Sequence, residues 1–388
     1  MIKKIILICV NALLVIALIV CLVASSSIRT TLRSQQAASA WAGQSGERYA
    51  QVSVFFPETS SFSENSVMAL RHSLESTLEN ASIETPHGRR IYADAWSTTH
   101  QISLVDSRGN PVSANAIAVG GDFFLFHPYN LRSGSYLLPS DIMHDRVVLD
   151  EELAWRLFGA IDLAGFQVLI NARPFIVAGV ISRDTDFAST TAYTNTFSSS
   201  ANDPFISGPA PAIPGLFMTL EALIEITQTD ISISTYEIVL PNPITGFALE
   251  TVEQLIPDPS ADIIENSARY TLSNTFATIR SFGERSMHTY PIIYPYWENA
   301  ARFTEDWIAL LLVLTFVFMA FPLICGIIYL VKLIRFGVKQ GKRTINKQIE
   351  KHDKRAYEKY LLQQSDGTDK DFNLYDVDDI IDEIKNGN

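Results

Sequence analysis

One group of residues in this sequence approximates a phosphate-binding loop. Gly337 and Gly341 are followed by Lys342, but three residues separate the glycines where the loop has four, and Arg343 stands where Ser or Thr would hold Mg²⁺. The group also follows a long apolar run, whereas a phosphate loop follows a strand. We therefore expect this chain to bind no ATP, so that any ATP-driven function would need an ATPase on another chain.

Asp141, His144 and Asp145 lie close together in sequence and carry the oxygen and imidazole ligands that divalent metals accept. No HExxH motif or paired CxxC motif completes a zinc site. The alternative is a solvated loop before a strand, and the sequence favours it. We expect no bound metal and no cofactor.

A second metal-like pattern lies in the acidic C-terminal tail. Asp369, Asp371 and Asn373 resemble the start of an EF-hand loop. Leu374 takes the place of the required Gly, and Ile380 takes the place of the bidentate Glu. The match therefore fails.

Nucleophilic catalysis has no motif in this sequence. No G-x-S-x-G is present, and the region between the apolar ends lacks the lysine that Ser–Lys chemistry needs. Six histidines are scattered through that region and are expected to be surface or satisfied core residues: His72, His87, His100, His127, His144 and His288. The sequence predicts no catalytic residue and no enzyme.

Lysine placement predicts how the chain crosses a membrane. Lys3 and Lys4 are followed by no lysine until Lys332. Between Ser25 and Asp306 there are 31 acidic residues and 16 arginines, a net charge of −15, whereas the whole chain carries −12. The positive-inside rule places both termini in the cytoplasm and the middle outside. A middle region this acidic argues against nucleic acid as a ligand.

Two apolar runs, at residues 5–24 and 307–331, are each long enough to span a bilayer. The first is too long for the apolar region of a cleaved signal peptide, which favours a membrane anchor. The cysteines Cys9, Cys21 and Cys325 all lie in these runs, so disulfides cannot stabilise the region between them. Residues 25–46 either extend the first helix as a stalk or form a loose linker.

Periodicity predicts two β-α-β units outside the membrane. The first has a strand at 51–56 and a helix with a capping box from Ser61 to Glu64. Its helix carries the apolar stripe Val67, Leu70, Leu74 and Leu78, and its second strand is at 90–96. The second unit has a strand at 236–240, a helix containing Leu249, Val252 and Ile256, and a strand at 270–272. Residues 183–215 are polar and are predicted to form an irregular loop.

Residues 117–181 hold the densest signals for regular structure. A short strand at 147–149 leads into Asp150, a helix N-cap, and Gly159 ends the helix. A hairpin then follows, with strands at 166–170 and 175–181. We expect Phe158 to be buried against this hairpin and Trp155 to lie off the apolar face. Aromatic residues at 288–307 suggest the level of the lipid headgroups.

This central segment contains a series of motifs in a fixed order: Phe123 and Phe124 after Gly-Gly-Asp, then RSG, VVLDEELAWRLFG, GFQVLI and PFIVAGVI, ending at Ile181. In this order the segment resembles the MacB-like periplasmic core domain of ABC-type permeases. Members of that family typically have one transmembrane helix before the domain and three after it, whereas this chain has one on each side. The resemblance implies a permease-like or accessory subunit that works with a separate ATP-binding subunit.

The sequence thus predicts a multi-pass protein of the cell membrane with an α+β extracytoplasmic domain. The domain comprises two β-α-β halves and an inserted β-rich subdomain with a hairpin. The expected partners are the ATP-binding subunit and the lipid bilayer, and a further permease subunit or a second copy of this chain would be additional partners. The alternative function is a membrane-anchored sensor or binding module. The expected parts are 1–4 cytoplasmic; 5–24 membrane; 25–306 extracytoplasmic, with 45–115 and 236–295 as the α+β subdomain and 116–235 as the insert; 307–331 membrane; and 332–388 cytoplasmic.

Overall fold

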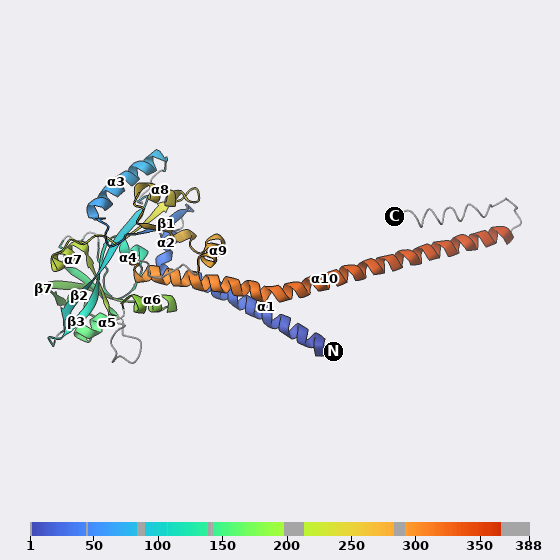
Figure 1. The fold of residues 1–388 in the computed structure, drawn as a ribbon, viewed down its shortest axis with the longest axis horizontal. Coiled ribbons are helices and arrows are strands. Elements are labelled where there is room, and N and C mark those ends of the chain that lie inside the picture. The colour runs from blue at the N-terminus through green and yellow to red at the C-terminus, as the bar shows by residue number, and fades with distance from the viewer. Residues whose placement is uncertain are drawn as a thin grey trace. The chain divides into compact units, whose positions relative to one another are not determined.

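The computed structural model describes residues 2–43, 46–83, 90–106, 108–138, 141, 143–197, 213–282 and 292–365 (Figure 1). The chain divides into two compact units. One unit, Ile16–Val317, contains all strands of the described residues. The other consists of Met1–Val15 together with Phe318–Asn388.

Ten strands form one mixed sheet in the order β10-β1-β9-β2-β3-β8-β5-β7-β4, and β6 pairs with both β2 and β7. The predicted fold class, an α+β domain between two apolar helices, is confirmed. The strands are β1 (Tyr49–Phe55), β2 (Ala93–Val105), β3 (Pro111–Gly121), β4 (Asn130–Gly134), β5 (Arg146–Asp150), β6 (Gln167–Ile170), β7 (Arg173–Ser182), β8 (Gly215–Thr219), β9 (Thr235–Pro241) and β10 (Asp262–Glu265).

Half of the sheet closes on itself. β2, β3, β8, β5, β7 and β6 pair in turn, and β6 returns to β2 through the pair Leu104↔Ile170. The closed ring contains two parallel pairs, β3 with β8 and β5 with β7. β2 belongs to both halves, because its first residues pair with β9 and its last with β6. The two halves therefore share one strand, which had been expected to end at Trp96.

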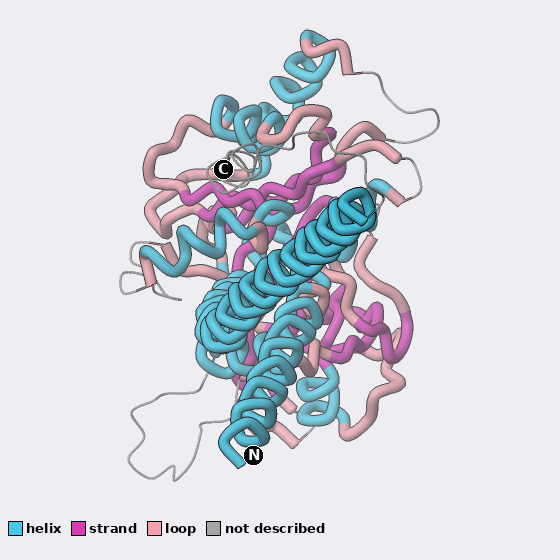
Figure 2. The backbone as a smooth tube through the Cα atoms, turned by 90° about the vertical axis from the view of Figure 1, so that its right-hand side faces the viewer, coloured by secondary structure: helices cyan, strands magenta, loops and turns pink. Residues whose placement is uncertain are grey.

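Helices cover the sheet (Figure 2). α3 and α8 pack on each other beside β1, while α5 and α7 pack on the strands of the ring. The helices of the domain are α2 (Ala37–Ala42), α3 (Glu64–Asn80), α4 (Phe123–Phe126), α5 (Glu151–Phe158), α6 (Phe187–Phe197), α7 (Leu220–Thr227), α8 (Phe247–Leu255) and α9 (Leu272–Arg280), with 3-10 turns η1 (Arg33–Gln35) and η2 (Asn266–Ala268).

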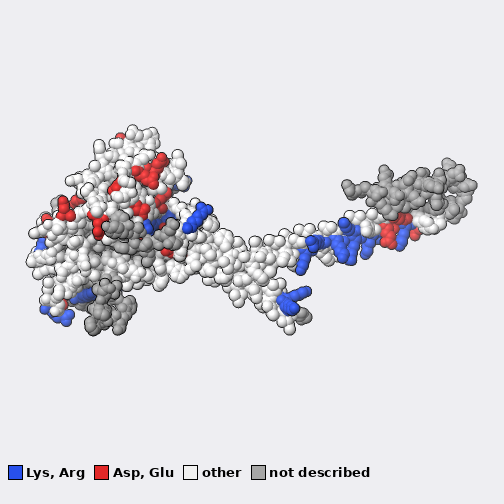
Figure 3. Space-filling model, viewed as in Figure 1, with Lys and Arg blue, Asp and Glu red and all other residues white. Residues whose placement is uncertain are grey.

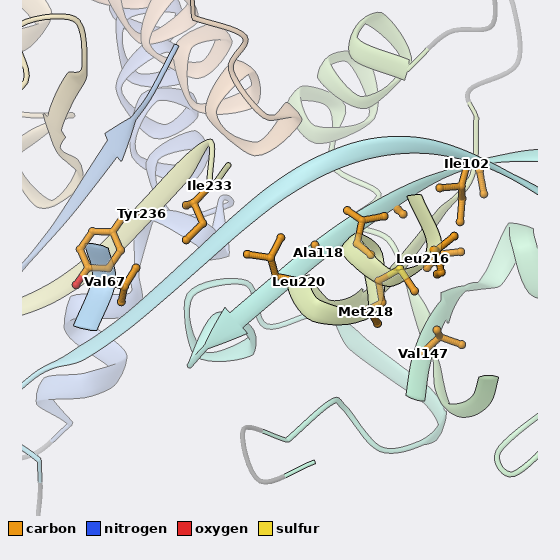
Figure 4. Packing of buried hydrophobic residues seen from close by; sticks show 14 of the residues in the cluster. Val67, Ile102, Ala118, Val147, Leu216, Met218, Leu220, Ile233 and Tyr236 are labelled. Atoms are coloured by element: carbon orange, nitrogen blue, oxygen red, sulfur yellow. The ribbon is translucent and has the colours of Figure 1, made fainter. Parts of the chain in front are cut away.

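A single apolar cluster extends through both halves of the domain. Val67 of α3 and Tyr236 of β9 lie at one end of it, and Ile102, Val147 and Leu216 of the ring at the other (Figure 4). The predicted stripe of α3, Val67, Leu70, Leu74 and Leu78, is buried in this cluster. The cluster makes the two halves one packing unit.

The predicted strand, helix and hairpin around Asp150 are confirmed as β5, α5, β6 and β7. The Asp150 carboxylate accepts a 2.6 Å hydrogen bond from the amide of Leu153, which caps α5, and Gly159 ends that helix in the left-handed conformation. The same carboxylate accepts a 2.6 Å bond from the amide of Gly215. Asp150 therefore also ties α5 to β8.

Four local predictions are wrong. The N-cap of α3 is Ser63, which forms its capping box with Ser66, so the Ser61–Glu64 box does not form. Residues 270–272 form the turn after η2 and the first residue of α9, and the strand in this region is β10. The predicted loop at 183–215 contains the helix α6. Its mixture of Ala, Thr and Tyr gives no clear helical pattern in the sequence. Phe158 is only partly buried, with its ring 6.3 Å from that of Phe166, whereas Trp155 is exposed as expected.

In the described part of the chain, two apolar helices are long enough to cross a membrane: α1 (Ile2–Arg29) and α10 (Tyr296–Ser365). α10 continues unbroken through Pro322. The expected second span began at 307, but Ile308 and Ala309 are buried within the protein. Neither alternative for residues 25–46 holds in full, because α1 ends at Arg29 and the described residues after it fold as η1 and α2.

Candidate functional site: the junction of the helical stems with the sheet

The residues with a chemical pattern in the sequence do not assemble into a reactive centre among the described residues. Asp141 pairs with Arg146, and His144 instead faces Thr219, at 3.2 Å, and Glu221, at 3.5 Å. No group of three or more His, Cys, Asp or Glu side chains in the described part of the chain could hold a metal ion. Gly337–Arg343 is helical within α10, and Asp369–Ile380, His87 and His288 lie outside the described residues.

The described residues concentrate their buried polar contacts where the two membrane helices enter the domain. We call residues 32–42, which follow α1, the first stem, and residues 296–306, which begin α10, the second stem. Both belong to the unit Ile16–Val317. The stems reach the sheet from far apart in the sequence and are joined through the short turn η2.

The first stem is fastened by amide side chains. Gln51 of β1 donates to the carbonyl of Ser34 at 2.8 Å and accepts from the amide of Ala37 at 3.1 Å. Gln35 accepts a 3.0 Å hydrogen bond from Asn266 of η2, and the hydroxyl of Ser267 accepts from the amide of Gln51 at 2.9 Å. Buried polar groups that are satisfied in this way hold one defined geometry.

The second stem is fastened by ion pairs that start one residue after η2. Arg269 donates to both carboxylate oxygens of Glu298 at 2.8 Å, and its Nε lies 3.1 Å from Glu305. Arg302 pairs with the same Glu298 at 2.9 Å, as its i,i+4 spacing predicts, and with Asp262 of β10 at 2.7 Å. The side chains of Arg269 and Glu298 are each only 1% exposed.

Electrostatics explains why these charges remain inside the protein. Burial raises the pKa of Glu298, and the guanidinium groups of Arg269 and Arg302 oppose that shift. Burial alone lowers the pKa of Arg269, but the carboxylates of Glu298 and Glu305 outweigh it, so the pKa of Arg269 is raised. Each charge therefore depends on its partners, and loss of one would leave another buried and uncompensated.

Aromatic residues of the second stem pack onto the opposite side of the junction. Tyr296 and Trp297 are both 4% exposed, and the Tyr296 hydroxyl lies 2.6 Å from that of Tyr129. The sequence suggested the headgroup level for Tyr294, Tyr296 and Trp297, but they are core residues here. The prediction was wrong because these rings precede the lipid-exposed part of α10 and face the sheet.

A buried pair of His127 and Glu237 lies next to the ring of Trp297. His127 Nε2 lies 2.5 Å from Oε2 of Glu237 on β9, and Ser53 of β1 donates to the other carboxylate oxygen at 3.2 Å. The His127 ring has its centre 4.5 Å from those of both Phe123 and Trp297. The serine contacts the carboxylate and not the imidazole, so the trio lacks the order of a catalytic triad. It joins the sheet to the first turn of α10.

α6 closes the junction with small residues. Ala188 and Ala192 of α6 pack with Ala300 and Ala301 of α10 and with Leu32 of the first stem. A polar cavity of about 310 Å³ beside α6 is lined in part by Glu152, Arg183 and Tyr193. Arg183 is paired there with Glu152, lies 3.5 Å from Asp150 and covers the Tyr193 ring at 4.4 Å. Its charge is therefore already balanced.

Hydrogen bonds and buried ion pairs connect the first stem to β1 and η2, and the second stem to Arg269, directly after η2, and to β10. The sequence showed only the Glu298–Arg302 spacing. It did not show Gln35, Gln51, Arg269 or the His127–Glu237 pair, because each of these finds its partner through the fold.

The chain matches the family model described as MacB-like periplasmic core domain over residues 10–242. Among solved structures, it is similar to the periplasmic region of MacB from Actinobacillus actinomycetemcomitans, with 16% identity, coverage of 61% of this chain and 93% of that one, and a TM-score of 0.37. The extracellular domain of the noncanonic ABC-type transporter YknZ from Gram-positive bacteria is also similar, with 10% identity, coverage of 55% and 99%, and a TM-score of 0.36. No curated protein matches the chain.

Proposed function

Because this chain belongs to the family of the MacB-like periplasmic core domain, we propose that it is a non-enzymatic permease-like or accessory subunit of an ABC-type transporter. A separate ATPase in the cytoplasm would drive the membrane helices, and the helices would move the extracytoplasmic domain. Membership of this family supports an ATPase partner in general. The single observation that favours mechanical coupling is the junction, where both stems meet through η2.

The charge distribution supports the proposed orientation. Asp and Glu gather on the domain, and Lys and Arg gather on the part of α10 that follows its apolar segment (Figure 3). Residues 332–355 hold most of these basic side chains. Such a segment suits the anionic headgroups of the cytoplasmic leaflet.

Site-specific labelling checks this orientation. Ser113→Cys on β3 and Gln348→Cys on α10 place single thiols at exposed positions, in a chain whose native cysteines are replaced. A membrane-impermeant thiol reagent should label the first variant in whole cells and spare the second. Permeabilised cells, in which both should react, are the control. Labelling of Gln348→Cys alone in intact cells would show the opposite orientation and contradict the proposed one.

Purification in mild detergent tests the function itself. The full chain should bring down a cytosolic protein that hydrolyses ATP, and that ATPase activity should change when the chain is added to the isolated partner. A chain truncated after Gln364 asks whether the acidic tail, which lies outside the described residues, makes the contact. Recovery of a kinase or regulator, with no ATP-hydrolysing protein, would favour a membrane-anchored sensor.

A further inference from the structure

α9 exposes apolar side chains where a helix of a soluble domain would expose polar ones. Leu272 and Phe276 are one turn apart and are 59% and 44% exposed, and Phe282, just after the helix, is 56% exposed. Large exposed aromatic and aliphatic residues on one short helix mark an interaction surface. Arg280 in the last turn is exposed as well.

The buried side of α9 is small and polar. Thr275 and Thr278 are 4% and 6% exposed, and their hydroxyls donate to the carbonyls of Thr271 and Asn274 in the same helix. In both cases the acceptor is a carbonyl one turn earlier in the same helix. The apolar surface of α9 therefore faces outward, and the core does not contain it.

α9 lies beside the apolar part of α10. The ring centre of Phe276 is 6.3 Å from that of Phe316, and both residues belong to the unit Ile16–Val317. Phe316 is itself 47% exposed, and the neighbouring Val317 of α10 is 59% exposed. The apolar surface of α9 is thus continuous with the surface of α10 that faces lipid.

Sequence spacing places Phe316 at the edge of the bilayer. No charged residue occurs between Phe316 and Lys332, which comes sixteen positions later, so a span of about 20 residues that ends at Lys332 begins about one turn before Phe316. A helix needs about 20 predominantly apolar residues to cross the hydrocarbon core. Since Ile308 and Ala309 are buried in protein, the lipid-exposed segment starts later than the apolar run does.

We propose that α9 lies in the membrane interface on the domain side, with Leu272, Phe276 and Phe282 inserted at the headgroup–acyl boundary and Arg280 directed to lipid phosphates. An amphipathic segment with aromatic and aliphatic residues on one face and a basic residue beside it binds such a boundary. The domain therefore contacts the bilayer through α9 as well as through the membrane helices. This contact fixes its height above the membrane.

Spin labels on the reconstituted full chain test this proposal. Leu272→Cys and Phe276→Cys are made in a chain without native cysteines, labelled with a nitroxide and placed in phosphatidylcholine vesicles. Met68→Cys on α3, a helical position that is 65% exposed, is the matched control. For labels at 272 and 276, the ratio of collisions with oxygen to collisions with a water-soluble nickel chelate should be several-fold higher than for the control label.

Leu272→Cys keeps the test valid if Phe276→Cys disturbs the contact with Phe316. Two outcomes would overturn the proposal. In the first, both labels have the aqueous accessibility of the Met68→Cys label. In the second, both are shielded from oxygen and nickel alike and lose this shielding when the protein-to-lipid ratio is lowered. The second outcome would assign the surface to a second copy of the chain.

Discussion

Replacing Arg269 by leucine should lower the free energy of unfolding by about 3–5 kcal/mol, because it leaves Glu298 buried without its main partner. Arg302 still contacts Glu298, but from a site that is 17% exposed and shared with Asp262. Denaturation of the full chain in mild detergent, followed by tryptophan fluorescence, measures the loss. Trp297 lies next to Glu298 and reports on this region directly.

The double variant Arg269→Leu/Glu298→Leu separates the charge from the packing. Removing both partners eliminates the uncompensated charge, so most of the lost stability should return. Arg156→Ala, which breaks an exposed pair with Glu152, should change stability by less than about 1 kcal/mol. If Arg269→Leu were as stable as the wild type, the ion pairs would not hold α10 to the domain.

Replacing Phe175 by alanine should cost about 3–5 kcal/mol, as for a large residue removed from a core. Phe175 lies on β7, is fully buried and belongs to the apolar cluster that extends through both halves of the domain. Removing its ring would leave a cavity among closely packed residues. The same denaturation experiment measures the effect.

Phe166→Ala is the matched control, since Phe166 precedes the same hairpin but is 54% exposed. We expect this variant to lose less than about 1 kcal/mol, because little buried area is removed. Equal losses for Phe175→Ala and Phe166→Ala would mean that Phe175 does not belong to the packed core described above.

The sequence predicts those parts of this fold whose cause is local. Asp150 caps the helix that starts at the next residue, and Gly159 ends it, so strand, helix and hairpin follow from about thirty adjacent residues. The stripe of α3 is visible for the same reason. Ser61 and Glu64 have the spacing of a capping box, but the backbone shows that Ser63 is the N-cap.

The junction depends on long-range contacts, and these leave no periodic signal. Arg269 meets Glu298 across 29 residues, and Gln35 meets Asn266 across 231. Tyr296 and Trp297 of the second stem look like headgroup anchors in the sequence. Aromatic residues before an apolar run occur both at the headgroup level and in a protein core, so composition does not separate the two. Closure of the ring likewise depends on Leu104 and Ile170, which no spacing rule connects.

The position of β1 has a consequence for synthesis. Among the described residues, the strand partners of β1 are β9 and β10, so its edges stay open until residues near 265 have been made. The junction is incomplete until Glu298 follows. At roughly 5–20 residues per second, the ribosome needs about 10–50 s to pass from β1 to Glu298. The domain therefore completes its fold late. Its first strand stays unpaired beside the membrane until the strands at the far end of the domain have been made.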